Sequence, residues 1–355
     1  MRTAPRTSRD RRKAWLCALV ALVPLSCASL EYVPPDKIKV TDLPVVSYPF
    51  AWMDNERILM RIKSGSKTDA RGEGRYATFD LVSYNYKTGE RHNYGRVGQQ
   101  ICYADGYISH TRADDDDDEV IIAVYGKLGK ETTRRVRRGE MSFQRGARGS
   151  CRPWSKAPQR PSWVNADTTI WRLWPRLGFI DCRTDFVSPL AKDVRARFYG
   201  MTDKVGVELP FSCYSVSGYG SLRYYPFNKA YFAFEFDYRH PWPEGKDRKA
   251  YWLYPNGRVE ILTFPYSTAI RDTAVPVVGG FLAFSRSYGR NDDYWVYFLT
   301  PNSQTRLYRG NALGITSPDG CKVAMLIDPD FMVKARSRKA KTPVSLKVLD
   351  FCQSR

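Results

Sequence analysis

The chain repeats one local pattern, in which a short apolar segment ends at a tight turn and a second apolar segment follows at once. The plainest copy is Ser317-Pro318-Asp319-Gly320, which precedes the apolar segment from Cys321 to Met325. The other turns are centred at Asp54, Asp105, Leu177-Gly178, Asn228 and Gly279. A β unit that recurs about every 40 to 60 residues is typical of a propeller or a similar array.

Each turn is followed by a polar stretch and then by a second hairpin, as in Val82–Tyr94 and Tyr251–Leu262. Gly89 and Gly257 at the hairpin tips supply the positive φ that tight turns require, and the flanking residues are aromatic or β-branched. One unit is therefore four antiparallel strands, a to d. The pattern predicts an all-β fold, a β-propeller of four-stranded blades. Six blades is the favoured number, and five and seven are the alternatives.

The Ser317–Gly320 turn resembles the hallmark of the TolB-type β-propeller repeat, a Ser-Pro-Asp-Gly turn between the first two strands of each blade. The resemblance implies a single propeller domain over residues 36–352. The last unit has a strand c at Val344–Phe351 but no strand d after it. We expect Lys37–Val40 to supply this strand and to close the ring, which removes open sheet edges.

The N-terminus resembles a bacterial export signal. A basic region precedes the apolar stretch Ala14–Leu25, which is too short to span a bilayer comfortably, and Pro24-Leu25-Ser26-Cys27 resembles a lipobox. We expect residues 1–26 to be a signal peptide, Cys27 to be lipidated and residues 27–35 to be a tether. Ordinary cleavage after Ala28 is the alternative. Both predict export, either as a lipoprotein facing the periplasm or the cell surface, or as a secreted protein.

Six cysteines remain besides Cys27 in the predicted mature chain: Cys102, Cys151, Cys182, Cys213, Cys321 and Cys352. An even number in an exported protein favours three disulfides over metal binding. Cys321 begins a predicted strand b and Cys352 ends the adjacent strand c, so their ends meet at one face and predict a bridge. Cys151 with Cys182 is the next pair by proximity, which leaves Cys102 with Cys213. The three histidines are widely separated, so we predict no metal and no cofactor.

A basic insertion at about residues 137–163 links the second unit to the third. From Lys127 to Arg160 there are eleven Lys or Arg residues against two Glu residues, with tryptophans nearby. This composition favours an acidic protein, an anionic glycan or a lipid headgroup as partner, whereas export excludes nucleic acid as a routine partner. A solvated loop without a partner is the alternative. The candidate partner-binding residues are Arg134, Arg135, Arg137, Arg138, Trp154 and Trp163.

The strand order predicts that this insertion shares one face with the longer polar loops, including Ser64–Arg75 and the acidic run Asp114–Glu119. The acidic run lacks the spacing of a calcium loop, which favours a solvated loop. Ser215–Gly220 is rich in Gly and Ser but lacks a Gly-x-Ser-x-Gly elbow. We therefore expect a protein that is not an enzyme.

Together these features predict an exported, lipid-anchored propeller that binds a protein partner in the bacterial envelope. An immunity or inhibitor protein that caps a toxic enzyme is a specific version. The alternative is a glycan-binding or carbohydrate-active propeller, whose paired carboxylates cannot be recognised without coordinates.

Overall fold

The chain divides into two units, residues 1–31 and residues 32–355. All of the residues that the structure describes belong to the second unit. The computed structural model describes residues 37–45, 47–68, 75–98, 101–104, 106–113, 120–137, 169–173, 178–182, 195–199, 207–212, 223–234, 248–254, 256–264, 273–284, 295–329 and 343–352. Within these residues no helix is long and apolar enough to cross a bilayer.

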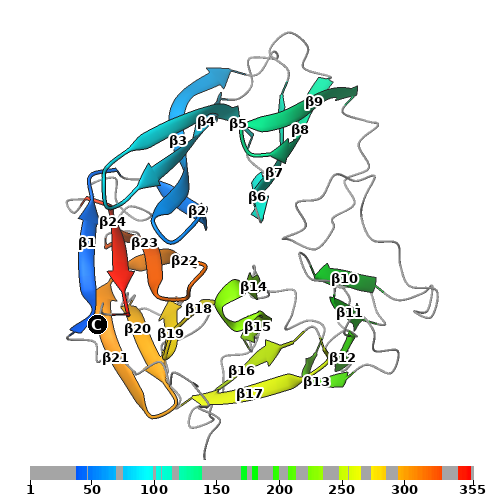
Figure 1. Ribbon diagram of the computed structural model, residues 1–355, viewed down its shortest axis with the longest axis vertical. Coiled ribbons are helices and arrows are strands. Elements are labelled where there is room, and N and C mark those ends of the chain that lie inside the picture. The colour runs from blue at the N-terminus through cyan, green and yellow to red at the C-terminus, as the bar shows by residue number, and fades with distance from the viewer. Residues whose placement is uncertain are drawn as a thin grey trace, which may run out of the picture. The chain divides into compact units, whose positions relative to one another are not determined.

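The described strands form six antiparallel sheets of four strands (Figure 1). In five of them neighbouring strands follow one another along the chain, and the sixth combines strands from both ends of the described chain. The first sheet contains β2 (Tyr48–Trp52), β3 (Arg57–Thr68), β4 (Arg75–Asn85) and β5 (Arg91–Val97). The second sheet contains β6 (Ile101–Ala104), β7 (Tyr107–Ala113), β8 (Val120–Lys127) and β9 (Lys130–Arg137). The third sheet contains β10 (Thr169–Leu173), β11 (Gly178–Cys182), β12 (Arg195–Tyr199) and β13 (Val207–Ser212).

The fourth and fifth sheets have the same order, whereas the last sheet takes its fourth strand from the N-terminal side of the first sheet. The fourth contains β14 (Arg223–Tyr225), β15 (Ala230–Phe234), β16 (Arg248–Leu253) and β17 (Val259–Phe264), with a 3-10 turn, η4 (Pro226–Asn228), between its first two strands. The fifth contains β18 (Thr273–Val277), β19 (Gly280–Phe284), β20 (Trp295–Thr300) and β21 (Ser303–Arg309). The last, which we name the closure sheet, contains β22 (Asn311–Thr316), β23 (Lys322–Asp328), β24 (Ser345–Asp350) and β1 (Lys39–Leu43).

This architecture confirms the predicted β-propeller of four-stranded blades. The predicted turns at Asp54, Asn228, Gly279 and Ser317–Gly320 fall between the first two strands of a sheet, and Gly178 begins the second strand of the third sheet. Asp105 and Leu177 lie outside the described residues. The turns succeed as predictors because they combine a residue suited to the turn with β-forming residues on both sides.

The closure sheet joins the two ends of the domain. Strand β1 pairs with β24 from Lys39↔Asp350 to Leu43↔Leu346, so the blue strand lies beside the red one in Figure 1. The strand expected at Lys37–Val40 therefore exists, but it begins two residues later and ends three residues later. Its pairing supplies the fourth strand that the last unit lacks in sequence order.

Hydrophobic clusters join consecutive sheets. Among the described residues, Leu59 of the first sheet packs with Ile108 of the second, and Met60 packs with Leu326 of the closure sheet. Met325 of the closure sheet packs with Phe298 of the fifth, whose Phe281 stacks on Phe232 of the fourth at a ring distance of 4.9 Å. In the third sheet only the Glu208 side chain is described, and it is exposed. Burial of these alternating faces, about 1.5–3 kcal/mol for each large apolar side chain, is the main stabilising contribution.

One predicted loop is partly wrong. Residues expected in the loop Ser64–Arg75 extend the β3–β4 hairpin, with Gly65 opposite Thr78 and Thr68 opposite Arg75. The polar sequence concealed this extension because Lys63 and Ser64 are exposed, so the hydrophobic alternation of a half-buried strand is absent there.

Candidate functional site

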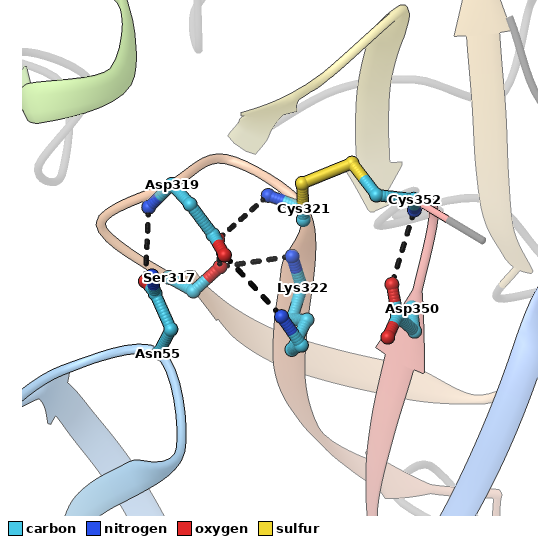
Figure 2. The surroundings of a disulfide bond; sticks show 7 residues. All are labelled: Asn55, Ser317, Asp319, Cys321, Lys322, Asp350 and Cys352. Atoms are coloured by element: carbon cyan, nitrogen blue, oxygen red, sulfur yellow. Dashed lines mark hydrogen bonds and ion pairs between the residues drawn. A yellow bond between two sulfur atoms is a disulfide. The ribbon is translucent and has the colours of Figure 1, made fainter. Parts of the chain in front are cut away.

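The turn Ser317–Gly320 is closed by side chains as well as by the backbone. The Ser317 hydroxyl accepts the N–H of Lys322 at 2.9 Å, and Asp319 Oδ1 accepts the N–H of Cys321 at 3.0 Å (Figure 2). The Ser317 hydroxyl also donates to the Asp319 carboxylate, and Lys322 Nζ lies 3.3 Å from Asp319 Oδ2. Short side chains with oxygen acceptors are suited to this role because they replace backbone partners in a tight turn.

Gly320 is required by both conformation and space. Its φ is 76°, and a Cβ at this position would lie 2.5 Å from the ring of Phe227. A side chain here would adopt a strained backbone and collide with the turn of the fourth sheet.

The predicted bridge between Cys321 and Cys352 is present, with a Cα–Cα distance of 5.1 Å (Figure 2). Next to it, the N–H of Phe351 donates to the carbonyl of Cys321 at 2.8 Å, and the N–H of Cys352 donates to Asp350 Oδ1 at 3.0 Å. The end of β24 is thus fastened to the start of β23.

Hydrogen bonds also run from the closure sheet to both neighbouring sheets. The N–H of Asp319 donates to Asn55 Oδ1 at 3.2 Å, and the buried Trp52 Nε1 donates to the carbonyl of Ile315 at 2.9 Å. On the other side, the N–H of Val278 donates to the carbonyl of Gly320 at 2.9 Å. The polar groups of this region bond to one another, which is typical of a structural junction.

The matching turn of the first sheet carries a charged cluster. Burial alone raises the pKa of Asp54, but backbone N–H groups of Glu56 and Arg57 and the Arg57 guanidinium at 2.6 Å outweigh it, so the pKa is lowered. The Glu56 side chain is about half exposed, and its hydrogen bond from Lys87 at 2.6 Å lowers its pKa. This cluster joins the two turns of one sheet, so its charges already have partners.

The predicted partner-binding arginines lie elsewhere, on the outer strand of the second sheet. Arg134, Arg135 and Arg137 belong to β9 and are all exposed, with Arg134 opposite Ala123 and Arg135 opposite Ile122 on β8. Of the three, only Arg137 falls within the insertion predicted at about residues 137–163, and the structure places it instead at the end of β9. The paired strand holds all three arginines in a fixed order. No ion pair between described residues engages Arg134 or Arg137.

Several predicted residues lie outside the described part of the chain: Cys27, Cys151, Cys213, Arg138, Trp154 and Trp163. Cys102 is the second residue of β6 and Cys182 is the last residue of β11. The pairing predicted for these cysteines stays a prediction.

His110 is a feature that our sequence reasoning passed over. It lies on β7, is 7% exposed, and its Nδ1 has no hydrogen-bond partner among the described residues. Burial, and secondarily the charge of Arg112, lower the pKa of His110 from 6.5 to about 4, which Glu131 partly opposes. The period-2 pattern was the missed signal, because His110 shares a strand face with the buried Ile108.

The described residues contain no group of three or more His, Cys, Asp or Glu side chains that could hold a metal ion. The arrangement of β9 is suited to electrostatic contact with an anionic surface, since it presents guanidinium groups on a rigid strand.

No family model matches the chain, and no curated protein matches it. Among solved structures, an oligogalacturonate lyase in complex with manganese is 8% identical, with a TM-score of 0.36 over 90% of this chain and 92% of that one. The β-propeller domain of the Trilobed protease from Pyrococcus furiosus is 9% identical, with a TM-score of 0.35 over 88% and 86% of the two chains.

A structure of prolyl endopeptidases is also similar, at 10% identity and a TM-score of 0.34 over 82% of this chain. The present chain spans 39% of that protein's length. At these identities and TM-scores the neighbours carry no inference about activity, so any function must be argued from the residues of this chain.

Proposed function

We propose that this chain is a non-catalytic binding propeller that holds an acidic protein partner in the bacterial envelope. The observation that supports the proposal is the set of exposed arginines on β9, in which Arg135 and Arg137 share one face of the strand and Arg134 lies on the other. They stand on the outer strand of a sheet whose inner strands are packed, so their spacing is fixed before a partner arrives. Fixed cations of this kind steer an anionic partner and set its orientation.

The export signal complements this proposal. Lipidation at Cys27 would keep the propeller at a membrane, because a bacterial lipoprotein carries several acyl chains and stable anchoring needs more than one. A lipoprotein that binds an acidic protein without catalytic motifs suits an immunity or inhibitor role against a toxic enzyme. Replacing Cys27 by Ser should release the protein to the soluble fraction and abolish palmitate incorporation.

The test of the binding proposal uses charge reversal. The triple variant Arg134→Glu, Arg135→Glu and Arg137→Glu should bind polyglutamate at least about tenfold more weakly than the parent and should show a flatter salt dependence. The matched control reverses Lys63, Lys229 and Lys249, which are equally charged and exposed but lie on other strands and turns. Equal losses in both triples would mean that net charge alone is responsible, and would contradict a defined site.

A parallel titration with polygalacturonate addresses the glycan alternative. If the protein binds this acidic glycan more tightly than polyglutamate, and if the binding depends on the β9 arginines in the same way, then the partner is a glycan and not a protein. Trp154 and Trp163 remain the proposed aromatic anchors of the adjacent insertion. Changing either to Ala should raise the dissociation rate of a captured partner without lowering the melting temperature much.

A further inference from the structure

The outer strand of the fourth sheet, β17, differs from the other outer strands. Its sequence from Val259 to Phe264 contains one charged residue, Glu260, and no proline. Glu260 already accepts a hydrogen bond from the Tyr254 hydroxyl at 2.9 Å and lies 3.7 Å from the Arg258 guanidinium. Ile261 is 52% exposed, and Thr263 is exposed as well.

The other outer strands carry features that discourage edge pairing. Strand β9 carries three arginines, β5 has Arg91 and Arg96, and β21 has Arg306 and Arg309. Strand β13 includes Pro210, which has no N–H, and β1 includes Lys39 and Asp42. Charges and proline at such edges are the usual protection against pairing with another chain.

The hydrogen-bond register shows which backbone groups of β17 face outward. The N–H of Tyr254 donates to the carbonyl of Arg258 at 2.9 Å, and Leu253 is opposite Val259. Because hydrogen-bonded pairs alternate along an antiparallel ladder, residues 258, 260 and 262 direct their backbone groups toward β16. Val259, Ile261 and Thr263 therefore direct their N–H and C=O groups away from β16, toward the edge that pairs with no other described strand.

These three residues form a self-complementary set. In an antiparallel pair of two β17 strands related by a two-fold axis at Ile261, each Val259 lies opposite the other Thr263. The three outward residues then exchange backbone hydrogen bonds, and β-branched side chains face β-branched side chains, a favourable cross-strand combination. Isologous contacts of this kind are the commonest way in which identical chains associate.

The distribution of charge also favours β17 as the edge at which two copies associate. The chain has a formal net charge of +19, so two copies repel one another at the arginine-bearing edges. At β17 the single carboxylate is matched by Arg258, and the outward residues are uncharged. We propose that β17 is a self-association edge, at which a second copy of this chain continues the fourth sheet. This inference is independent of the binding role proposed for β9.

Sedimentation velocity of the purified chain over a range of concentrations tests the proposal, and we expect a monomer–dimer equilibrium. Ile261→Lys places two ammonium groups opposite each other and should raise the dissociation constant of the dimer at least about tenfold. Val40→Lys is the matched control, because Val40 is 41% exposed on the outer strand β1. This control should dimerise like the parent, and both variants should keep the parent's melting temperature.

A cross-link provides a second measurement. Paired residues of this kind have Cα atoms about 5.5 Å apart, which a disulfide can bridge. Ile261→Cys should therefore yield a covalent dimer on oxidation, and Val40→Cys should not. A parent that stays monomeric throughout, or an Ile261→Lys variant that dimerises unchanged, would overturn the proposal. If the parent is a monomer that binds an extended segment of another protein, and if Ile261→Lys abolishes that binding, then the β17 edge serves that partner and not a second copy of this chain.

Discussion

The closure sheet and the second sheet have the same four-stranded plan but use their polar residues differently. In the closure sheet Ser317, Asp319 and Lys322 bond within one turn, and Asn55 and Trp52 bond to it from the first sheet. In the second sheet His110 is buried with an unpartnered Nδ1, and the arginines of β9 are exposed. The first arrangement stabilises the fold, whereas the second leaves His110 Nδ1 without a hydrogen bond, and Arg134 and Arg137 without an ion pair, among the described residues.

The disulfide should make the largest contribution within this comparison. Replacing Cys321 and Cys352 together by Ser should lower the free energy of unfolding by about 3–4 kcal/mol, because the bridge closes a long loop in the unfolded chain. The two residues are 31 positions apart. Denaturant unfolding followed by tryptophan fluorescence measures the loss.

The control for the disulfide is Asn55→Ala, which removes one hydrogen bond across the same junction. We expect it to cost about 1 kcal/mol. If the double Ser variant were as stable as the parent, then strand pairing of β24 with β23 and β1 would be enough to hold the chain terminus. The disulfide would then not distinguish the closure sheet from the second sheet in stability.

His110 should make the second sheet sensitive to acid. Its pKa is lowered from 6.5 to about 4 by burial and by Arg112, so the neutral form is preferred in the folded protein. The stability due to this preference is complete above pH 6.5 and is lost as the pH falls toward 4, by about 3 kcal/mol in all. His110→Leu should abolish this part of the pH dependence in urea unfolding between those pH values.

His92→Leu is the matched control, because His92 is an exposed histidine that contacts the Tyr94 ring at 4.5 Å. It should leave the pH dependence intact. An unchanged slope in His110→Leu would mean that His110 does not cause the loss of stability between pH 6.5 and 4.

Equivalent glycines in the two sheets allow a direct test of packing. Gly320 and Gly106 both occupy the first turn of their sheets with φ of 76° and 79°, but only Gly320 faces a neighbour, the Phe227 ring at 2.5 Å. Gly320→Ala should lower the free energy of unfolding by about 2 kcal/mol and Gly106→Ala by about 1 kcal/mol. The second value is smaller because only the backbone conformation is unfavourable there, without a steric clash. Equal costs, measured by thermal unfolding, would show that the closure turn is no more tightly packed.

The sequence predicted the fold well because its turns are local. Ser317–Gly320 bonds to itself, and Gly89 and Gly257 occupy positive φ, so these residues specify hairpins without tertiary help. The disulfide followed from strand order for the same reason. Long-range contacts were not predictable in this way. The bond of Asn55 to Asp319 spans 264 residues, and nothing near either residue indicates it.

The candidate site was only partly predictable. The arginines were identified by their charge, and Arg134 and Arg135 precede the predicted insertion, but the extension of β9 to Arg137 depends on pairing with β8. Val136 is the only apolar residue of β9, so hydrophobic periodicity is too weak to mark where the strand ends. The self-complementary edge of β17 depends on hydrogen-bond alternation, which sequence reasoning did not consider.

The smallest expected effect on stability concerns the β9 arginines themselves. Reversing Arg134, Arg135 and Arg137 to Glu should change the free energy of unfolding by less than about 0.5 kcal/mol, because exposed charges contribute little to folding. Lys322→Glu in the closure sheet is the comparison, since the Lys322 side chain is 13% exposed and its ammonium lies 3.3 Å from Asp319. It should cost more than about 1 kcal/mol by bringing two carboxylates together. A β9 variant that loses as much stability as Lys322→Glu would show that the arginines support the sheet. Their exposure would then no longer favour a role in binding.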